Sequence, residues 1–175
     1  MRYWEIINLL EFKLHGGVHF LKKESFIDSF LTRLIGTWQA NIFIRMNEGD
    51  QWLERSGELK NKFLYTKECL FQEFTVNSNV EAIGLNNFDF VRNRYVSIWN
   101  ENAGTGFMTG YGNWNDNYQI LGENGTFSHP VKKTIIDFVS TTEFLNEDTY
   151  KKKLYLPASR GGFFEAAILT YTRIN

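Results

Sequence analysis

The sequence has little of several features that would assign a protein to a class. Its one cysteine, Cys69, allows no disulfide within the chain, so we expect a reducing compartment and a cytoplasmic protein. Lysine and arginine number 19 against 20 aspartates and glutamates, which leaves no electrostatic argument for a nucleic acid or an anionic membrane as partner. No apolar run approaches the roughly 18 residues of a membrane-spanning helix. We therefore expect a soluble protein.

Prolines are scarce and aromatic residues are abundant. Only two prolines are present and neither lies inside a strong strand pattern, so nothing interrupts a β-ladder. Aromatic residues make up 17% of the chain, which suits a β-rich interior or the wall of a pocket. With 175 residues, of which 43% are hydrophobic, the chain fits one domain with one sizeable core.

A two-residue period begins at Gly36 and dominates the rest of the chain. Apolar side chains at Trp38, Ala40, Ile42, Ile44 and Met46 share one face of the first expected strand. Further strands are predicted at Leu53–Phe63, Leu64–Val76, Val80–Asp89, Arg94–Glu101, Gly106–Trp114, Tyr118–Thr126, Val131–Thr141, Tyr150–Leu156 and Phe163–Arg173. Turn-forming residues separate them, and Asn86-Asn87 and Asn124-Gly125 are taken as such turns.

Short strands with scarcely room for helices between them predict an antiparallel meander. Closing so long a sheet removes its exposed edges, so we expect a mainly β protein with one up-and-down barrel of about eight to ten strands. A two-sheet sandwich is the alternative. The barrel would span residues 36–175.

Residues 1–35 have helical spacing instead. Trp4, Ile7, Leu10 and Leu14 share one face before Gly16-Gly17 interrupts the pattern. A second helical stretch, Ser25–Leu34, leads into the first strand. We expect a helical extension that caps an open barrel end, lies on the barrel or makes a homodimer contact.

The segment Gly36-Thr37-Trp38, preceded by a short helix, resembles the Gly-x-Trp opening of lipocalin-like (calycin) barrels. The resemblance implies that Trp38 plugs the barrel floor and that a basic residue of the last strand covers its ring. Arg173 is the candidate for that place. A cation over an indole ring contributes roughly 0.5–2 kcal/mol, so this pair would help close one end of the barrel.

Taken together, the motifs of residues 30–174 are similar to the domain of unknown function 1579 family. The order of the motifs is the specific part of the resemblance. They are Gly36-Thr37-Trp38, Phe71-Gln72-Glu73-Phe74, Gly84-Leu85-Asn86-Asn87-Phe88-Asp89, Arg94-Tyr95-Val96-Ser97-Ile98-Trp99, Gly104-Thr105-Gly106-Phe107-Met108, Asn146-Glu147-Asp148-Thr149-Tyr150 and Thr170-Tyr171-Thr172-Arg173. The family implies a lipocalin-like barrel without an established activity.

The sequence gives no catalytic, metal or cofactor signature. His15 and His19 have a metal-chelating spacing, but Gly16-Gly17 between them breaks the helix that would bring them together. His129 precedes a proline and is taken as a loop residue. The glycines from Gly104 to Gly112 lack the Gly-Lys-Ser/Thr of a phosphate loop and better fit a strand beneath large aromatic side chains.

Three carboxylates share strand parity with apolar residues. Glu73, Asp137 and Glu165 would face the interior if the alternation held, and each would then need a partner or a raised pKa. A structural hydrogen bond or ion pair is the favoured interpretation. An enzyme using Glu73 or Asp137 as acid or base is the alternative.

The favoured function is binding of a small, apolar or amphipathic ligand inside the barrel, without a cofactor. The expected pocket residues are Ile42, Ile44, Phe71, Glu73, Trp99, Met108, Tyr111, Phe138, Tyr155 and Tyr171. A third interpretation is a fully packed barrel that works through its surface. These assignments depend on strand parity, which one β-bulge would invert.

Overall fold

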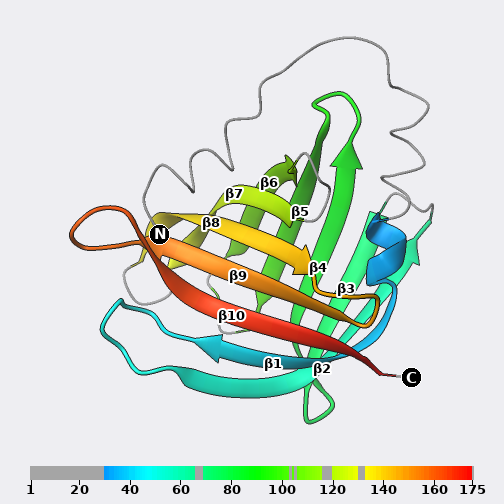
Figure 1. Cartoon of the computed structure of the whole chain (residues 1–175), viewed down its shortest axis with the longest axis horizontal. Coiled ribbons are helices and arrows are strands. Elements are labelled where there is room, and N and C mark those ends of the chain that lie inside the picture. Colours follow the sequence, from blue (N-terminus) through cyan, green and yellow to red (C-terminus); the bar gives the residue numbers. More distant parts are fainter. Residues whose placement is uncertain are drawn as a thin grey trace.

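The computed structural model describes residues 30–65, 69–102, 104, 106–115, 120–129 and 133–174, and shows a closed antiparallel barrel of ten strands (Figure 1). The strands are β1 (Gly36–Ile44), β2 (Leu53–Leu64), β3 (Cys69–Val76), β4 (Asn79–Asp89), β5 (Arg94–Glu101), β6 (Phe107–Trp114), β7 (Ile120–His129), β8 (Thr134–Phe144), β9 (Thr149–Pro157) and β10 (Phe163–Ile174).

Each strand pairs with the next one along the chain, and β1 pairs with β10 to close the ring. The first and last strands are thus hydrogen-bonded from Thr37↔Ile174 to Ile44↔Ala167. Closure gives each described strand a neighbour on both sides, which is the physical advantage expected of a long meander. The prediction of a mainly β, antiparallel up-and-down barrel is confirmed.

Two predicted turns lie inside strands. Asn86-Asn87 is in β4 and Asn124-Gly125 is in β7, and both were predicted wrongly. His129 is likewise the buried last residue of β7 and not a loop residue. Position 125 needs a glycine because a Cβ there would lie 2.5 Å from Cζ of Phe138. Packing therefore accounts for this glycine, and turn geometry does not.

Residues 30–34 form the described part of the lead-in helix, and the rest of the predicted N-terminal helical segment, including His15 and His19, lies outside the described residues. The helix lies beside the start of β1 and the end of β10 (Figure 1). Within the described part of the chain, no helix is long and apolar enough to cross a membrane.

The two ends of the barrel differ in what covers them. We call the end with the helix, where β1 begins, the closed end. The opposite end carries the β1–β2 connection at 45–52 and the β9–β10 connection at 158–162, and we call it the open end. The inward faces of the strands line the interior between the closed end and the open end.

Candidate binding site in the barrel interior and at its open end

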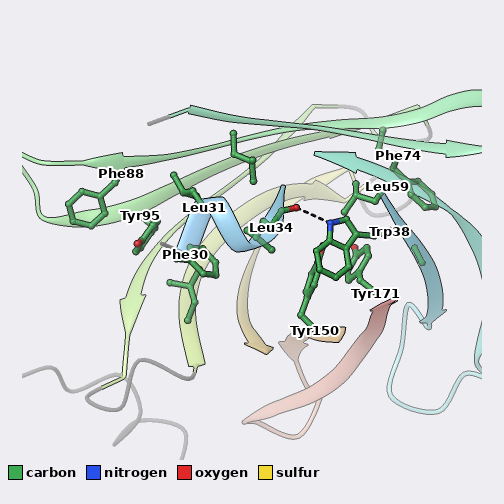
Figure 2. Close-up of a cluster of buried hydrophobic side chains, with 14 of the residues drawn as sticks. Phe30, Leu31, Leu34, Trp38, Leu59, Phe74, Phe88, Tyr95, Tyr150 and Tyr171 are labelled. Carbon is green, nitrogen blue, oxygen red and sulfur yellow. Dashed lines mark hydrogen bonds between the residues drawn. The ribbon is translucent and has the colours of Figure 1, made fainter. Parts of the chain in front are cut away.

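Trp38 is the centre of the closed end. Its side chain is 0% exposed, and its Nε1 donates a 2.8 Å hydrogen bond to the carbonyl of Leu34, the last residue of the helix (Figure 2). The ring of Tyr150 meets the indole edge-on at 4.8 Å, and Tyr171 stacks on Tyr150 at 4.4 Å. The indole thus joins the helix to strands from both ends of the sequence.

Arg173 covers the outer side of this indole. Its guanidinium carbon lies 4.1 Å from the ring centroid of Trp38, which confirms the predicted pairing. The same guanidinium donates to the carbonyls of Ile35 at 2.7 Å and Arg33 at 2.9 Å. Gly36 has a φ of +125°, and a Cβ there would lie 2.7 Å from Nη1 of Arg173. Both the backbone angle and the space require glycine at this position.

The helix fills the rest of the closed end with apolar side chains (Figure 2). Phe30 packs edge-on against Trp114 at 4.3 Å and Tyr95 at 5.4 Å. Leu31 and Leu34 are buried beside it. Because these side chains come from the helix and from strands around the barrel, the described part of the closed end is a packed apolar core.

A buried ion pair lies on the inward faces midway along the barrel. Glu123 of β7 accepts a 2.7 Å hydrogen bond from Ser97 of β5 on Oε1. Its Oε2 accepts hydrogen bonds from Ser140 of β8 at 3.0 Å and from Nζ of Lys152 of β9 at 3.2 Å. Glycine at position 110 of β6 leaves room for the Ser97 hydroxyl that donates to this carboxylate, since a Cβ there would lie 2.7 Å from Ser97 Oγ.

Glu123 is held in its ionised form. Burial alone raises the pKa of this carboxyl, but the charge of Lys152 and the hydrogen bonds from Ser97, Lys152 and Ser140 outweigh burial, and the pKa lies below its usual value. A carboxylate that is already ionised and has three donors is neither a free base nor a proton donor at neutral pH.

A chain of side-chain amides occupies the interior on the other side of the barrel. Asn86 of β4 donates to Gln72 of β3, Gln72 donates to Asn61 of β2 at 3.1 Å, and Asn61 donates to the carbonyl of Leu34 at 2.8 Å. All three donate in the same direction, toward the end of the helix. The interior therefore has polar groups on strands from β2 to β9, and on β2 they reach the closed end.

A second apolar cluster lies between these polar side chains and the open end. It contains Phe138, Leu156 and Ala166, with Met108, Phe127, Ile136, Leu154 and Phe164 packed against it. Above it is a pocket of about 730 Å³. Leu156, Phe164 and Ile136 form its apolar floor, and its rim includes residues 46–49 and 157–160. The charged rim side chains are Glu48, Asp137 and Arg160.

Six predicted pocket residues lie on inward faces. They are Ile42, Ile44, Trp99, Met108, Phe138 and Tyr171. Ile42, Trp99 and Tyr171 belong to the closed-end cluster or pack against it, while Met108 and Phe138 belong to the open-end cluster. Ile44 shares the face of Trp38 at the mouth of the barrel. None of these six lines the pocket at the open end.

Four predicted pocket residues lie on outward faces, which corrects the sequence interpretation. On β3 the buried residues are Leu70 and Phe74, so Phe71 and Glu73 lie on the opposite face. Tyr111 alternates with the inward Gly110 and Gly112 and has Arg94 over its ring at 4.3 Å. Tyr155 lies between the inward Leu154 and Leu156.

The other two carboxylates also lie outside the barrel. Asp137 is exposed at the pocket rim, on the face opposite to Phe138. Glu165 pairs across strands with the outward Tyr155 and forms an ion pair with Lys153 at 2.7 Å. A β-bulge between Glu165 and Ala167 inverts the parity, and this explains why the apolar face of Leu169 and Tyr171 does not include Glu165.

Sequence reasoning missed Glu123 and Lys152. A usable signal was present, because Leu121, Glu123, Gly125 and Phe127 form one alternating row. The predicted strand Tyr118–Thr126 contained Glu123, but the assignment of Asn124-Gly125 as a turn left the inward row unrecognised. Lys152 lies within Lys151-Lys152-Lys153, which is typical of a solvated edge and gives no sign that its middle residue faces inward.

The chain belongs to the family described as "Protein of unknown function (DUF1579)", whose model matches residues 27–173. The resemblance found in the sequence is thereby confirmed. A comparison with the curated proteins gives no match.

Two solved structures are similar to this chain at low sequence identity. The crystal structure of Rv2717c from M. tuberculosis is 10% identical, with a TM-score of 0.58, over 85% of this chain and 98% of that one. A protein of unknown function from the DUF3598 family of Nostoc punctiforme is 11% identical, with a TM-score of 0.44, over 82% of this chain and 48% of that one. At such identities the likeness to Rv2717c supports the barrel fold alone.

Proposed function

We propose that the protein binds a small, mostly apolar or amphipathic molecule that enters the barrel at its open end. One observation carries the proposal: one end of the barrel is filled by a helix and aromatic side chains, while the other has a pocket of about 730 Å³ over inward-facing apolar residues. Such an arrangement suits a container that a ligand enters from the open end.

The pocket has the properties of a small-molecule site. Its volume falls within the roughly 300–1,000 Å³ of known ligand pockets, and such pockets combine apolar walls with a few polar groups. Leu156 and Phe164 supply apolar floor, while Arg160 and Asp137 supply charge at the rim. An amphipathic molecule would place its apolar part on the floor.

The geometry does not favour the enzyme alternative. Glu73 faces outward and Asp137 is exposed at the rim, so the two carboxylates proposed for acid–base chemistry do not share the interior. Glu123 is inside, but its three donors hold it ionised. Within the described part of the chain, no group of three or more His, Cys, Asp and Glu side chains is placed to hold a metal ion.

The experiment is a fluorescence titration with N-phenyl-1-naphthylamine, a neutral apolar dye. We expect saturable binding to the unmodified chain. Ala158→Trp places an indole in the pocket rim and should weaken dye binding by about tenfold or more, because the site is occupied by the new side chain. Val91→Trp is the matched control, since Val91 is 95% exposed in the β4–β5 connection at the closed end.

The outcome that would contradict the proposal is equally specific. If Ala158→Trp binds the dye as well as Val91→Trp does, the pocket is not the site. If neither variant nor the unmodified chain binds the dye, and native mass spectrometry finds only bare protein, the binding function is wrong.

A further inference from the structure

Lys152 lies below the pocket along one strand. On β9 the inward positions from the open end are Leu156, Leu154 and Lys152, and Leu156 forms part of the pocket floor. Four residues of strand correspond to about 13 Å, at roughly 3.3 Å per residue. A molecule that enters past Leu156 would have to extend past Leu154 of the same apolar cluster to reach the ammonium group of Lys152.

The side chain of Lys152 is partly accessible to solvent. It is 32% exposed although it points inward, whereas the side chain of its partner Glu123 is 3% exposed. An ammonium group has three N–H donors. Among the described residues, Glu123 is its hydrogen-bond partner, so donors remain for a ligand.

The charge of Lys152 is already compensated. Glu123 Oε2 lies 3.2 Å from Nζ, and the pair is neutral overall. Among the described residues, inward positions nearer the mouth also carry Arg55, opposite Ile42 on β2, and Glu101, which follows Trp99 on β5. A carboxylate ligand at Lys152 would add an uncompensated negative charge to a poorly solvated space, and such a charge is costly.

Resting on the proposed function, we infer that Lys152 anchors a ligand through an uncharged hydrogen-bond acceptor, such as a hydroxyl or carbonyl group, and that the site discriminates against carboxylates. A neutral acceptor uses the remaining donors of Lys152 without changing the charge of the interior. Its apolar body would lie toward Leu154 and Leu156.

The experiment compares two ligands of equal chain length, 1-dodecanol and sodium dodecanoate, as competitors of N-phenyl-1-naphthylamine at pH 8 and below their aggregation concentrations. We expect dodecanol to displace the dye with at least about tenfold higher affinity, because a hydrogen bond to a charged donor is gained and no net charge is buried. Equal or tighter binding of dodecanoate would overturn the inference while leaving the proposed function intact. Absence of dye binding would instead contradict the proposed function.

Two variants test the role of the ion pair. Glu123→Gln leaves Lys152 positively charged without a counter-charge, so the preference should reverse in favour of dodecanoate. Lys152→Met removes the donor, so dodecanol should lose its advantage over dodecane, which has no head group. Glu58→Gln is a matched control, since Glu58 pairs with Lys60 on exposed side chains.

If Glu123→Gln does not fold, the Lys152→Met variant alone tests whether Lys152 holds the head group. A far-ultraviolet circular dichroism spectrum first establishes that each variant keeps its β-structure. If Lys152→Met still binds dodecanol at least tenfold more tightly than dodecane, the head group is held elsewhere and the inference is wrong.

Discussion

Both ends of the barrel have a tryptophan covered by an arginine, and the two pairs have different consequences. At the closed end, Arg173 lies 4.1 Å from the ring centroid of Trp38, which is 0% exposed. At the open end, Arg45 lies 4.5 Å from the ring centroid of Trp52, which is 37% exposed. The same pair of side chains is thus a buried plug at one end and a surface contact at the other.

The partners of the two arginines explain the difference. Arg173 donates to the carbonyls of Arg33 and Ile35 and so holds the helix over the barrel. Arg45 donates to the carbonyls of Glu48 and Glu165 and so holds the β1–β2 connection at the pocket rim. One arginine closes an end, and the other positions a rim around an entrance.

The largest effect that this comparison predicts is on stability. Trp38→Ala removes a fully buried indole and should lower the free energy of unfolding by about 3–5 kcal/mol. Trp52→Ala removes an indole that is partly exposed, and a loss of about 1 kcal/mol or less is expected. Urea unfolding followed by circular dichroism measures both values. Similar losses of unfolding free energy for the two variants would show that Trp38 stabilises the barrel no more than Trp52 does.

The strands could be predicted from the sequence because alternation is local information, whereas the Trp38–Arg173 pair was predicted only from the resemblance to calycin barrels. Alternation marks a strand wherever one face is buried, and the closing strand follows once the sheet is known to be a barrel. Arg94–Glu101 was predicted with its observed bounds. The inward residues could not be predicted as well, since parity depends on the register between strands.

Two residues show why the site was harder to predict than the fold. Glu165 faces outward because an extra residue in β10 shifts the pattern, and no turn residue marks that bulge. Glu123 faces inward with the alternating row of Leu121 and Phe127, but the partners that hold its charge, Ser97, Ser140 and Lys152, come from three other strands. The alternation is readable in the sequence, whereas these long-range partners are not.

Gly125 allows a second test that compares the interior with the open end. Gly125→Ala would place Cβ 2.1 Å from the carbonyl oxygen of Thr109 and 2.5 Å from the ring of Phe138, so backbone and core must both move. We expect a loss of about 1–3 kcal/mol in the free energy of unfolding. Gly49→Ala, in the β1–β2 connection, meets nothing within 4 Å and should change it by about 0.5 kcal/mol or less. Equal urea midpoints for these two variants would mean that the close packing over Gly125 is not present in solution.

The smallest expected effect is on the pH dependence of stability. This dependence should differ between the buried Glu123–Lys152 pair and an exposed ion pair on the outer surface. The pKa of Glu123 lies below its ordinary value of 4.5 in the folded protein, so the unfolded chain binds this proton first as the pH falls. Its contribution to stability is therefore present above pH 4.5 and is lost as the pH falls through the folded pKa.

Replacing both partners, in Glu123→Gln/Lys152→Met, removes the titrating group without leaving a buried charge unpaired. Between pH 6 and pH 3 the unfolding free energy of this double variant should therefore decline less than that of the unmodified chain. Glu58→Gln/Lys60→Met removes an exposed pair and should decline like the unmodified chain, since exposed pairs contribute little. If the two double variants gave parallel curves, Glu123 would titrate as a surface carboxylate does. The buried ion pair would then not exist in solution, and the ligand preference inferred from it would have no basis.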